Sequence, residues 1–282
     1  MTTLDKAAFH VHGGPKLNIS DVKSFREIPR ALLLVDVSAS MFEPEEAALN
    51  RAVAEGIIMA AGPNDPLALT TFAERSDARA DFAASKSDLI SIVDRVVKGE
   101  RPKHPPTGIR TAIWDALLQA SALFPNSASN NVIFLITDGG DTFSHTDSKE
   151  VEAHLSSMGT RVFAVVFDDR PALNGDARLV NSMFDFADST GGRAFRMGVD
   201  TSFFNSLTHT WNLDTEGLAR ARKLGSYIYA LSSVFYRVDL QLETPLQKKT
   251  RIHLDVIEPD GTRLVAYYPH ELLPCSRGAA AK

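Results

Sequence analysis

Two apolar runs, each ending in an aspartate, constrain the fold of this chain most strongly. The first extends from Leu32 to Asp36, and the second from Val132 to Asp138. An unbroken apolar run of strand length is typical of a strand buried on both faces, as in a parallel sheet. In open sheets of this kind, ligands bind just beyond the carboxyl ends of the strands. The acidic residues that end these two runs are therefore candidates for a functional site.

Strand-like and helix-like segments alternate along the central part of the chain. Strands are expected at residues 31–36, 67–72, 131–137, 160–167 and 193–197, with a short edge segment at 81–84. Apolar residues at helical spacing predict helices at 45–61, 89–97, 111–123, 148–158, 179–189 and 216–232, and a short helix at 201–210. Ser87 or Asp88 is expected to cap the helix at 89–97. This alternation predicts an α/β fold, a Rossmann-like, doubly wound, mostly parallel sheet flanked by helices.

The two ends of the chain follow other patterns. Residues 1–28 have no clear period and are expected to form a leader or edge segment before the α/β domain at 29–233. Over residues 234–275, apolar and polar side chains alternate around the turn signal Pro259-Asp260-Gly261, which predicts a small C-terminal antiparallel β appendage. Residues 276–282 are expected to be a disordered tail.

Composition excludes several classes of function. The net charge of −5, without any basic block, argues against a nucleic-acid partner. A single cysteine, Cys275, can form neither an internal disulfide nor a thiolate metal site. No stretch approaches the ~20 apolar residues of a transmembrane segment. The residues after Met1 lack the features of a signal peptide, so a cytoplasmic location is expected. The oligomeric state stays open.

Three turns rich in oxygen ligands lie far apart in the sequence. Asp36, Ser38 and Ser40 follow the first apolar run, Thr111 follows a proline-rich loop, and Asp138 ends the second run. Hydroxyl and carboxylate oxygens are the hard ligands that Mg²⁺ prefers. Together these five residues form a candidate metal site.

With this order and spacing of motifs, residues 30–236 resemble a von Willebrand factor type A domain with an intact metal-ion-dependent adhesion site (MIDAS). The resemblance implies that Ser38, Ser40 and Thr111 ligate Mg²⁺ directly, with Mn²⁺ or Ca²⁺ as possible substitutes. Asp36 and Asp138 would act mostly through water or hydrogen bonds. The closing helix at 216–232 and the appendage are also similar to those of a bacterial family of von Willebrand A-related proteins.

Two departures from the family pattern lie beside the proposed ligands. Ala39 stands where glycine is commoner, and Ile109-Arg110 replaces a glycine-rich pair before Thr111. Neither change removes a ligand.

The expected function is that of a protein-binding module. Neutral hydroxyl ligands leave the cation electrophilic toward one more oxygen, and a Glu or Asp carboxylate of a protein partner is the natural choice. An acidic rim would repel that partner until the metal reverses the local charge, so binding should depend on metal. The rim residues are Glu43, Glu45, Glu46, Asp138 and Asp141.

Two other functions stay open. One is a scaffold or assembly subunit, for example beside an AAA+ ATPase. The other is a Mg²⁺-dependent hydrolase, which is disfavoured because no general base is placed and neither a Gly-x-Ser-x-Gly elbow nor a phosphate-binding loop occurs. No enzymatic activity, catalytic residue or organic cofactor is therefore expected.

Each candidate residue also has a structural interpretation. Asp36, Ser38, Ser40 and Asp138 could be turn residues only, and Thr111 could cap its helix. Asp115 is expected to stabilise the helix dipole, and Asp141 to lie on the rim. The three rim glutamates form either a solvated helical turn or an adjacent Ca²⁺ site. Surface positions are expected for His104, His145 and His154, and core positions for Trp114 and Trp211.

Overall fold

The computed structural model divides the chain into two compact units. Unit 1 comprises Met1–Glu27 together with Val234–Lys282, and unit 2 is Ile28–Ser233. The structure describes residues 6–12, 17–42, 44–97, 110–125, 130–168, 177–198, 202–205, 210–213, 215–248, 250–257, 263–264 and 271–272. The leader expected at 1–28 and the appendage expected at 234–275 thus belong to one unit. The tail expected at 276–282 lies outside the described residues.

Unit 2 is built on a six-stranded sheet in the order β5-β4-β3-β6-β7-β8. All neighbouring strands are parallel except β5, which pairs antiparallel with β4 at the edge. This sheet confirms the predicted α/β fold. The strands are β3 (Arg30–Asp36), β4 (Leu67–Phe72), β5 (Ser76–Ala80), β6 (Asn131–Thr137), β7 (Arg161–Asp168) and β8 (Arg193–Gly198).

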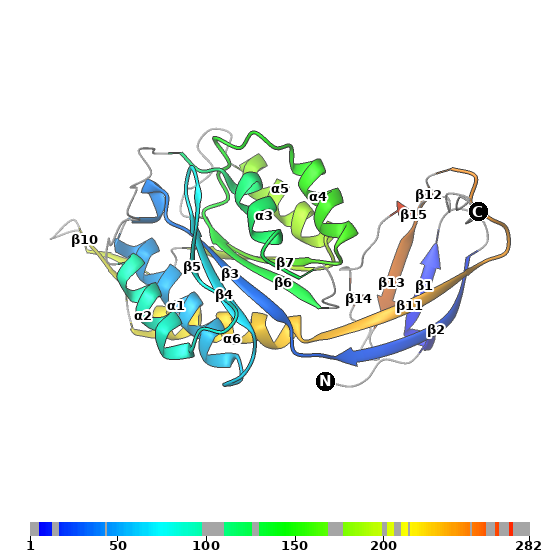
Figure 1. The fold of residues 1–282 in the computed structure, drawn as a ribbon, viewed down its shortest axis with the longest axis horizontal. Helices are drawn as coiled ribbons and strands as arrows, with labels where there is room; N and C mark the ends of the chain where they lie inside the picture. The colour runs from blue at the N-terminus through cyan, green and yellow to red at the C-terminus, as the bar shows by residue number, and fades with distance from the viewer. Residues whose placement is uncertain are drawn as a thin grey trace. The chain divides into compact units, whose positions relative to one another are not determined.

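Helices cover both faces of this sheet (Figure 1). One face packs against α1 (Pro44–Ala60), α2 (Lys86–Val97) and α6 (Thr215–Ser232), and the other against α3 (Ile113–Ser121), α4 (Ser148–Ser157) and α5 (Ala177–Ser189). Side chains of β3 alternate between the two cores, because successive residues of a strand point to opposite faces. Leu33 and Val35 enter the first core, and Leu32 and Leu34 the second.

Three local predictions in unit 2 are wrong. The helix expected at 201–210 is replaced by the antiparallel pair β9 (Ser202–Asn205) and β10 (Thr210–Leu213). The edge strand is β5, and the expected edge segment at 81–84 contains a turn. Ser85 caps α2, instead of Ser87 or Asp88, because its Oγ accepts from the Asp88 backbone N at 3.2 Å and donates to the Asp88 carboxylate at 2.6 Å.

Unit 1 is antiparallel throughout its described strands. The long strands β2 (Leu17–Arg26) and β11 (Val234–Leu242) pair along their whole length. A second sheet has the order β1-β13-β14, and a separate pair is formed by β12 and β15. The remaining elements are η1 (Lys6–Ala8), β1 (Phe9–His12), β12 (Thr250–Arg251), β13 (His253–Ile257), β14 (Arg263–Leu264) and β15 (Glu271–Leu272).

Unit 1 has a small apolar core of its own, which is centred on Phe9 and Val256. Tyr236 packs against it, with its ring centroid 5.4 Å from that of Phe9. Residues from both ends of the chain therefore build this unit together.

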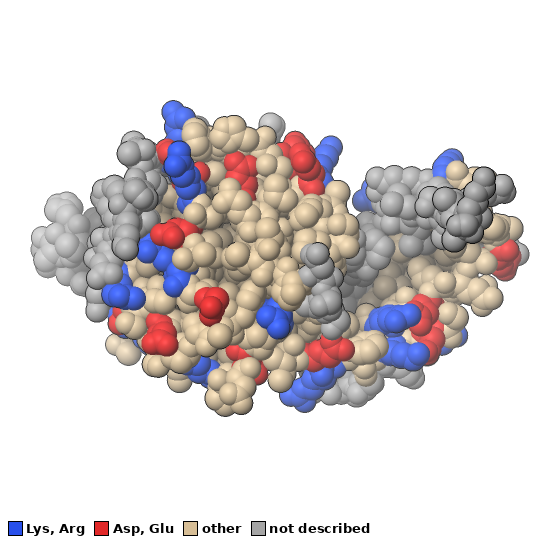
Figure 2. Space-filling model, viewed as in Figure 1, with Lys and Arg blue, Asp and Glu red and all other residues tan. Residues whose placement is uncertain are grey.

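Charges on the visible described surface are of mixed sign. Figure 2 shows Lys and Arg interspersed with Asp and Glu over this face of unit 2. No helix among the described residues has the length and apolar character that a membrane span requires.

Candidate metal-binding site

The candidate site lies where the strand order of the sheet reverses. Strand β3 has β4 on one side and β6 on the other, and both of these neighbours are parallel to it. Crevices form at such switch points, outside the carboxyl ends of the strands. Asp36 is the last residue of β3, and Asp138 directly follows β6. The fold therefore brings the two sequence-predicted aspartates to one edge of the sheet.

Asp36 joins the two turns that follow β3 and β6. Its side chain is fully buried, and its Oδ1 accepts a hydrogen bond from the Ser38 backbone N at 2.8 Å. Its Oδ2 accepts from Thr137 Oγ1 at 2.7 Å, and the same Thr137 hydroxyl accepts from the Gly139 backbone N at 3.1 Å. Thr137 was not predicted from the sequence, since nothing local distinguishes a threonine at the end of an apolar strand.

The two serines of the first turn lie side by side. Ser38 is buried and Ser40 is half-buried, and their Oγ atoms are 3.2 Å apart. The short helix η2 (Ala39–Phe42) holds this turn, with the Met41 backbone N donating to the Ser38 carbonyl at 3.1 Å. Two hydroxyls at this separation can offer lone pairs to the same cation.

Thr111 reaches this edge through backbone hydrogen bonds. The Thr111 carbonyl accepts from the backbone N of Thr142 at 2.8 Å and of Phe143 at 3.0 Å, and the next residue, Ala112, donates from its N to the Ala73 carbonyl at 2.9 Å. Ala73 directly follows β4, so the Thr111 segment is tied to the turns after β4 and β6. Thr111 is buried, and no described residue hydrogen-bonds its hydroxyl.

Asp141 and Ser144, not Thr111, cap helix α3. The N-cap position is Ala112, which makes no side-chain cap. The Ile113 backbone N donates to Asp141 Oδ1 at 2.7 Å, and the Trp114 N donates to Ser144 Oγ at 3.0 Å. Asp141 is therefore engaged in capping, a role that the sequence did not reveal, and its place on the rim of the site stays a prediction. A cap from a loop about thirty residues away leaves no local sequence signal.

Asp115 anchors the loop that follows the site. Its carboxylate accepts from the backbone N of His145 at 3.0 Å and of Thr146 at 2.9 Å. Burial by itself would raise the pKa of Asp115, but these hydrogen bonds outweigh burial and lower the pKa to about 2. Asp115 is thus a loop-holding residue, as well as an acid in the first turn of α3.

Electrostatics at this edge suit a cation. Burial, and then repulsion from the Asp138 carboxylate, raise the pKa of Asp36, against the hydrogen bonds from Thr137 and Ser38. Asp138 is half-buried, and its Oδ1 accepts from the Gly140 backbone N at 3.1 Å. Asp36 and Asp138, together with the neighbouring hydroxyls of Ser38 and Ser40, form an oxygen-only donor set of the kind that Mg²⁺ prefers. No group of three or more His, Cys, Asp or Glu side chains among the described residues, at this edge or at any other place, could hold a metal. Metal binding at this edge would therefore depend on hydroxyl ligands as well as carboxylates.

The remaining sequence-predicted residues divide into core, surface and undescribed positions. Trp114 packs on the core with its ring centroid 4.8 Å from that of Phe186, and the side chain of His145 is 81% exposed. His154 is half-buried, with Nε2 3.1 Å from Ser121 Oγ, and so differs from the surface residue expected. The predictions for His104, Glu43, and the side chains of Glu45 and Trp211 fall outside the described residues. The adjacent Ca²⁺ site therefore stays a prediction.

Unit 2 matches a known protein family in sequence over part of its length. The family model of the von Willebrand factor type A domain matches residues 31–140, which contain all five predicted ligands. Together with the mostly parallel sheet and its two helical layers, this match shows that unit 2 has the von Willebrand factor type A fold. No curated protein matches the chain.

Solved structures with low sequence identity share the fold. Proximal thread matrix protein 1 from the mussel byssus aligns with a TM-score of 0.53 at 18% identity, over 79% of this chain and 51% of its own. A von Willebrand factor type A protein from Catenulispora acidiphila gives 0.52 at 12% identity, over 94% and 72%. An aerotolerance-related membrane protein from Bacteroides fragilis gives 0.50 at 16% identity, over 70% and 97%. The chain thus spans about half the length of the mussel protein.

Proposed function

We propose that this chain is a divalent-cation-dependent protein-binding module that grips an acidic side chain of a partner protein. The observation that carries the proposal is the convergence of three turns at one edge of the sheet. Asp36 bonds to the turn after β3 and to Thr137 at the end of β6, while Thr111 is tied to the loop at Thr142. These turns contain the neutral hydroxyls and the carboxylates that such a site requires.

The hydroxyl residues and the aspartates would have different roles in such a site. Ser38, Ser40 and Thr111 would hold Mg²⁺ with neutral hydroxyl oxygens, so the ligands would not cancel its charge. Asp36 orients the Ser38 turn through its hydrogen bond to the backbone, and Asp138 contributes negative charge from the second turn. A bound divalent cation supplies an electropositive centre that accepts one more hard oxygen, for which a carboxylate is well suited.

The test is metal-dependent capture of protein partners. In pull-downs from the source cells, the wild-type chain should retain partners in Mg²⁺ and release them in EDTA. Ser38→Ala should abolish this capture, whereas the control Ser157→Ala should not, because Ser157 is exposed in the last turn of α4 and hydrogen-bonds only the His154 carbonyl. Thermal unfolding followed by circular dichroism checks that both variants are folded.

A scaffold role is the second candidate. It is favoured by unit 1, a separate β unit with its own core that contains none of the proposed ligands, and by fold likeness to an aerotolerance-related membrane protein. Capture that survives both EDTA and Ser38→Ala would support this candidate and contradict the adhesion-type proposal. Hydrolysis of an ester or phosphoester panel that is lost in Ser38→Ala would instead support an enzyme.

A further inference from the structure

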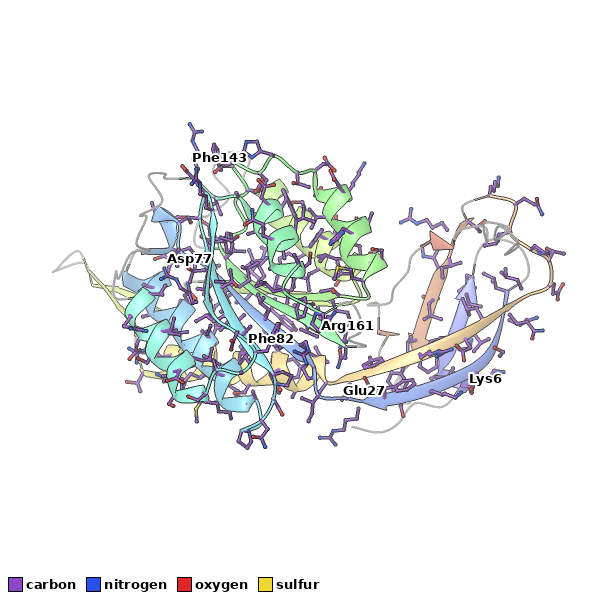
Figure 3. The ribbon with its side chains drawn as sticks, in the orientation of Figure 1. Lys6, Glu27, Asp77, Phe82, Phe143 and Arg161 are labelled. Atoms are coloured by element: carbon purple, nitrogen blue, oxygen red, sulfur yellow. The ribbon has the colours of Figure 1, made fainter. Side chains whose placement is uncertain are left out.

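Arg110 stands directly beside the proposed ligand Thr111 and is exposed. Its guanidinium carbon lies 5.1 Å from the centroid of the Phe143 ring, which fits a cation–π stack. The backbone N of Phe143 donates to the Thr111 carbonyl at 3.0 Å. The stack therefore holds the Arg110 cation against Phe143, a residue of the loop whose backbone also positions Thr111. Figure 3 shows Phe143 and Asp77 toward one end of unit 2, away from Phe82 and Arg161 at the other.

The Arg110 side chain has no acidic partner within the part of the chain that the structure describes. No acidic side chain of the described residues forms an ion pair with it. Asp141, on the loop after β6, and Asp115, in the first turn of α3, have other partners. Asp141 accepts from the Ile113 backbone and from Ser144, and Asp115 accepts from the backbone of His145 and Thr146. The guanidinium thus offers planar N–H donors to solvent from a restrained position.

A restrained guanidinium that forms no ion pair with any described acidic side chain is a receptor for carboxylates. Its fork of donors matches both oxygens of a carboxylate, and stacking on a ring lowers the entropy that is lost when it binds. A glycine at this position, as in the pattern that the sequence departs from, would offer no such charge. Binding of one acid at the metal would bring neighbouring residues of the partner close to Arg110.

We propose that Arg110 binds a second carboxylate of the partner, so that the chain prefers an acidic segment with two closely spaced acids to a segment with one. This inference rests on the proposed function, since the first carboxylate is the one held at the metal. Arg110 and Phe143 would then set specificity, whereas the five ligand residues would set metal dependence.

The experiment measures peptide binding to the full-length protein in Mg²⁺ by NMR titration. The probes are blocked glycine peptides that carry one Glu, two Glu at different spacings, or one Glu with Gln at the second position. At about 0.15 M salt, the second Glu should lower the Kd roughly 2- to 5-fold for at least one spacing, and Gln should not. Arg110→Gln should abolish this preference and leave Mg²⁺ uptake and single-Glu binding within about 2-fold.

A matched control tests whether the effect is local. Arg193 is also an exposed arginine stacked on a phenylalanine, with its guanidinium carbon 5.9 Å from the Phe195 ring centroid, but it begins β8 at the opposite edge of the sheet. Arg193→Gln should keep the full preference for two acids. Phe143→Leu, which keeps the cation and removes the ring, should reduce the preference, and provides a second variant if Arg110→Gln fails to fold.

The outcomes separate this inference from the proposed function. If single-Glu peptides bind in Mg²⁺ but no spacing of a second Glu improves the Kd, or if Arg110→Gln keeps the preference, the inference is overturned and the proposed function stands. If no Glu peptide binds the Mg²⁺-loaded protein, both are overturned. A preference that is lost in Arg110→Gln and kept in Arg193→Gln supports the inference.

Discussion

At the scale of single residues, the site depends on how buried polar groups are paired. Asp36 is fully buried and keeps its carboxylate bonded to Thr137 and to the Ser38 backbone. Removing one partner of a buried hydrogen bond costs more stability than replacing both partners by apolar groups. The polar group that remains is then buried without a hydrogen bond. Thr137 therefore matters to the site although it is not a proposed ligand.

Thr137→Val should destabilise the protein by about 1–3 kcal/mol and weaken Mg²⁺ uptake, because it removes the hydroxyl that bonds Asp36. The matched control is Thr70→Val on neighbouring β4. Thr70 is also buried, but its Oγ1 has no hydrogen-bond partner, so this change should be neutral or stabilising. Urea unfolding gives the free energies, and equal losses in both variants would contradict the assigned role.

Asp115 gives a prediction about pH. Its pKa in the folded protein is about 2, below the ordinary value near 4, so its contribution to stability is present above pH 4 and is lost as the pH falls toward 2. Asp115→Asn should lose about 1–2 kcal/mol at pH 7, and the difference from wild type should shrink by pH 3. Urea unfolding at both pH values measures the free energies of unfolding of the two proteins. A difference between them that is the same at pH 7 and pH 3 would contradict this account.

At the scale of elements, helices α1 and α6 pack closely enough to exclude side chains. A Cβ on Gly225 would lie 2.2 Å from the Val53 carbonyl O, and one on Gly56 would lie 2.1 Å from the Arg222 carbonyl O. Ser226 Oγ donates to the Gly56 carbonyl at 3.0 Å, and Arg222 Nε lies 2.8 Å from Glu55 Oε2. The two backbones thus touch through their glycines, with polar contacts beside them.

Gly225→Ala should therefore destabilise the protein by about 3 kcal/mol or more, since the backbone of α1 cannot move away without disturbing the core. Ser226→Ala, one residue along, removes only a hydrogen bond and should cost about 1 kcal/mol. Thermal unfolding of the two variants measures these two losses of stability. A Gly225→Ala variant as stable as Ser226→Ala would show that the helices separate easily.

Local patterns predicted the main strands and helices of unit 2, but not the strand pair β9–β10, the strands of residues 1–28, or the partners of elements across the chain. The apolar runs ending at Asp36 and Asp138 identified both the central strands and the site edge, because burial on two faces leaves a clear signal. The cap of α3 by Asp141 and Ser144, and the pairing of β2 with β11, join residues about 30 and about 220 positions apart. Such contacts depend on tertiary structure, which the spacing of apolar residues does not encode.

At the scale of the whole molecule, the chain forms two units with separate cores. Unit 1 combines both ends of the chain, and unit 2 contains every proposed ligand. A fragment of residues 28–233 should therefore fold and take up Mg²⁺ with a Kd within about 2-fold of the full chain, because all its metal-site contacts are internal. Calorimetric titration of both proteins measures this. A fragment that folds but takes up no metal would show that unit 1 contributes to the site.

The central claim is that oxygen atoms from three distant turns hold one divalent cation. The most direct test is a crystal structure of the protein grown with Mn²⁺, with the ion located by its anomalous scattering. The account predicts one peak bounded by the hydroxyls of Ser38, Ser40 and Thr111, and its loss in crystals of Ser38→Ala. A map with no peak at this edge of the sheet, or a Thr111 hydroxyl too far from Ser38 to share an ion, would contradict it.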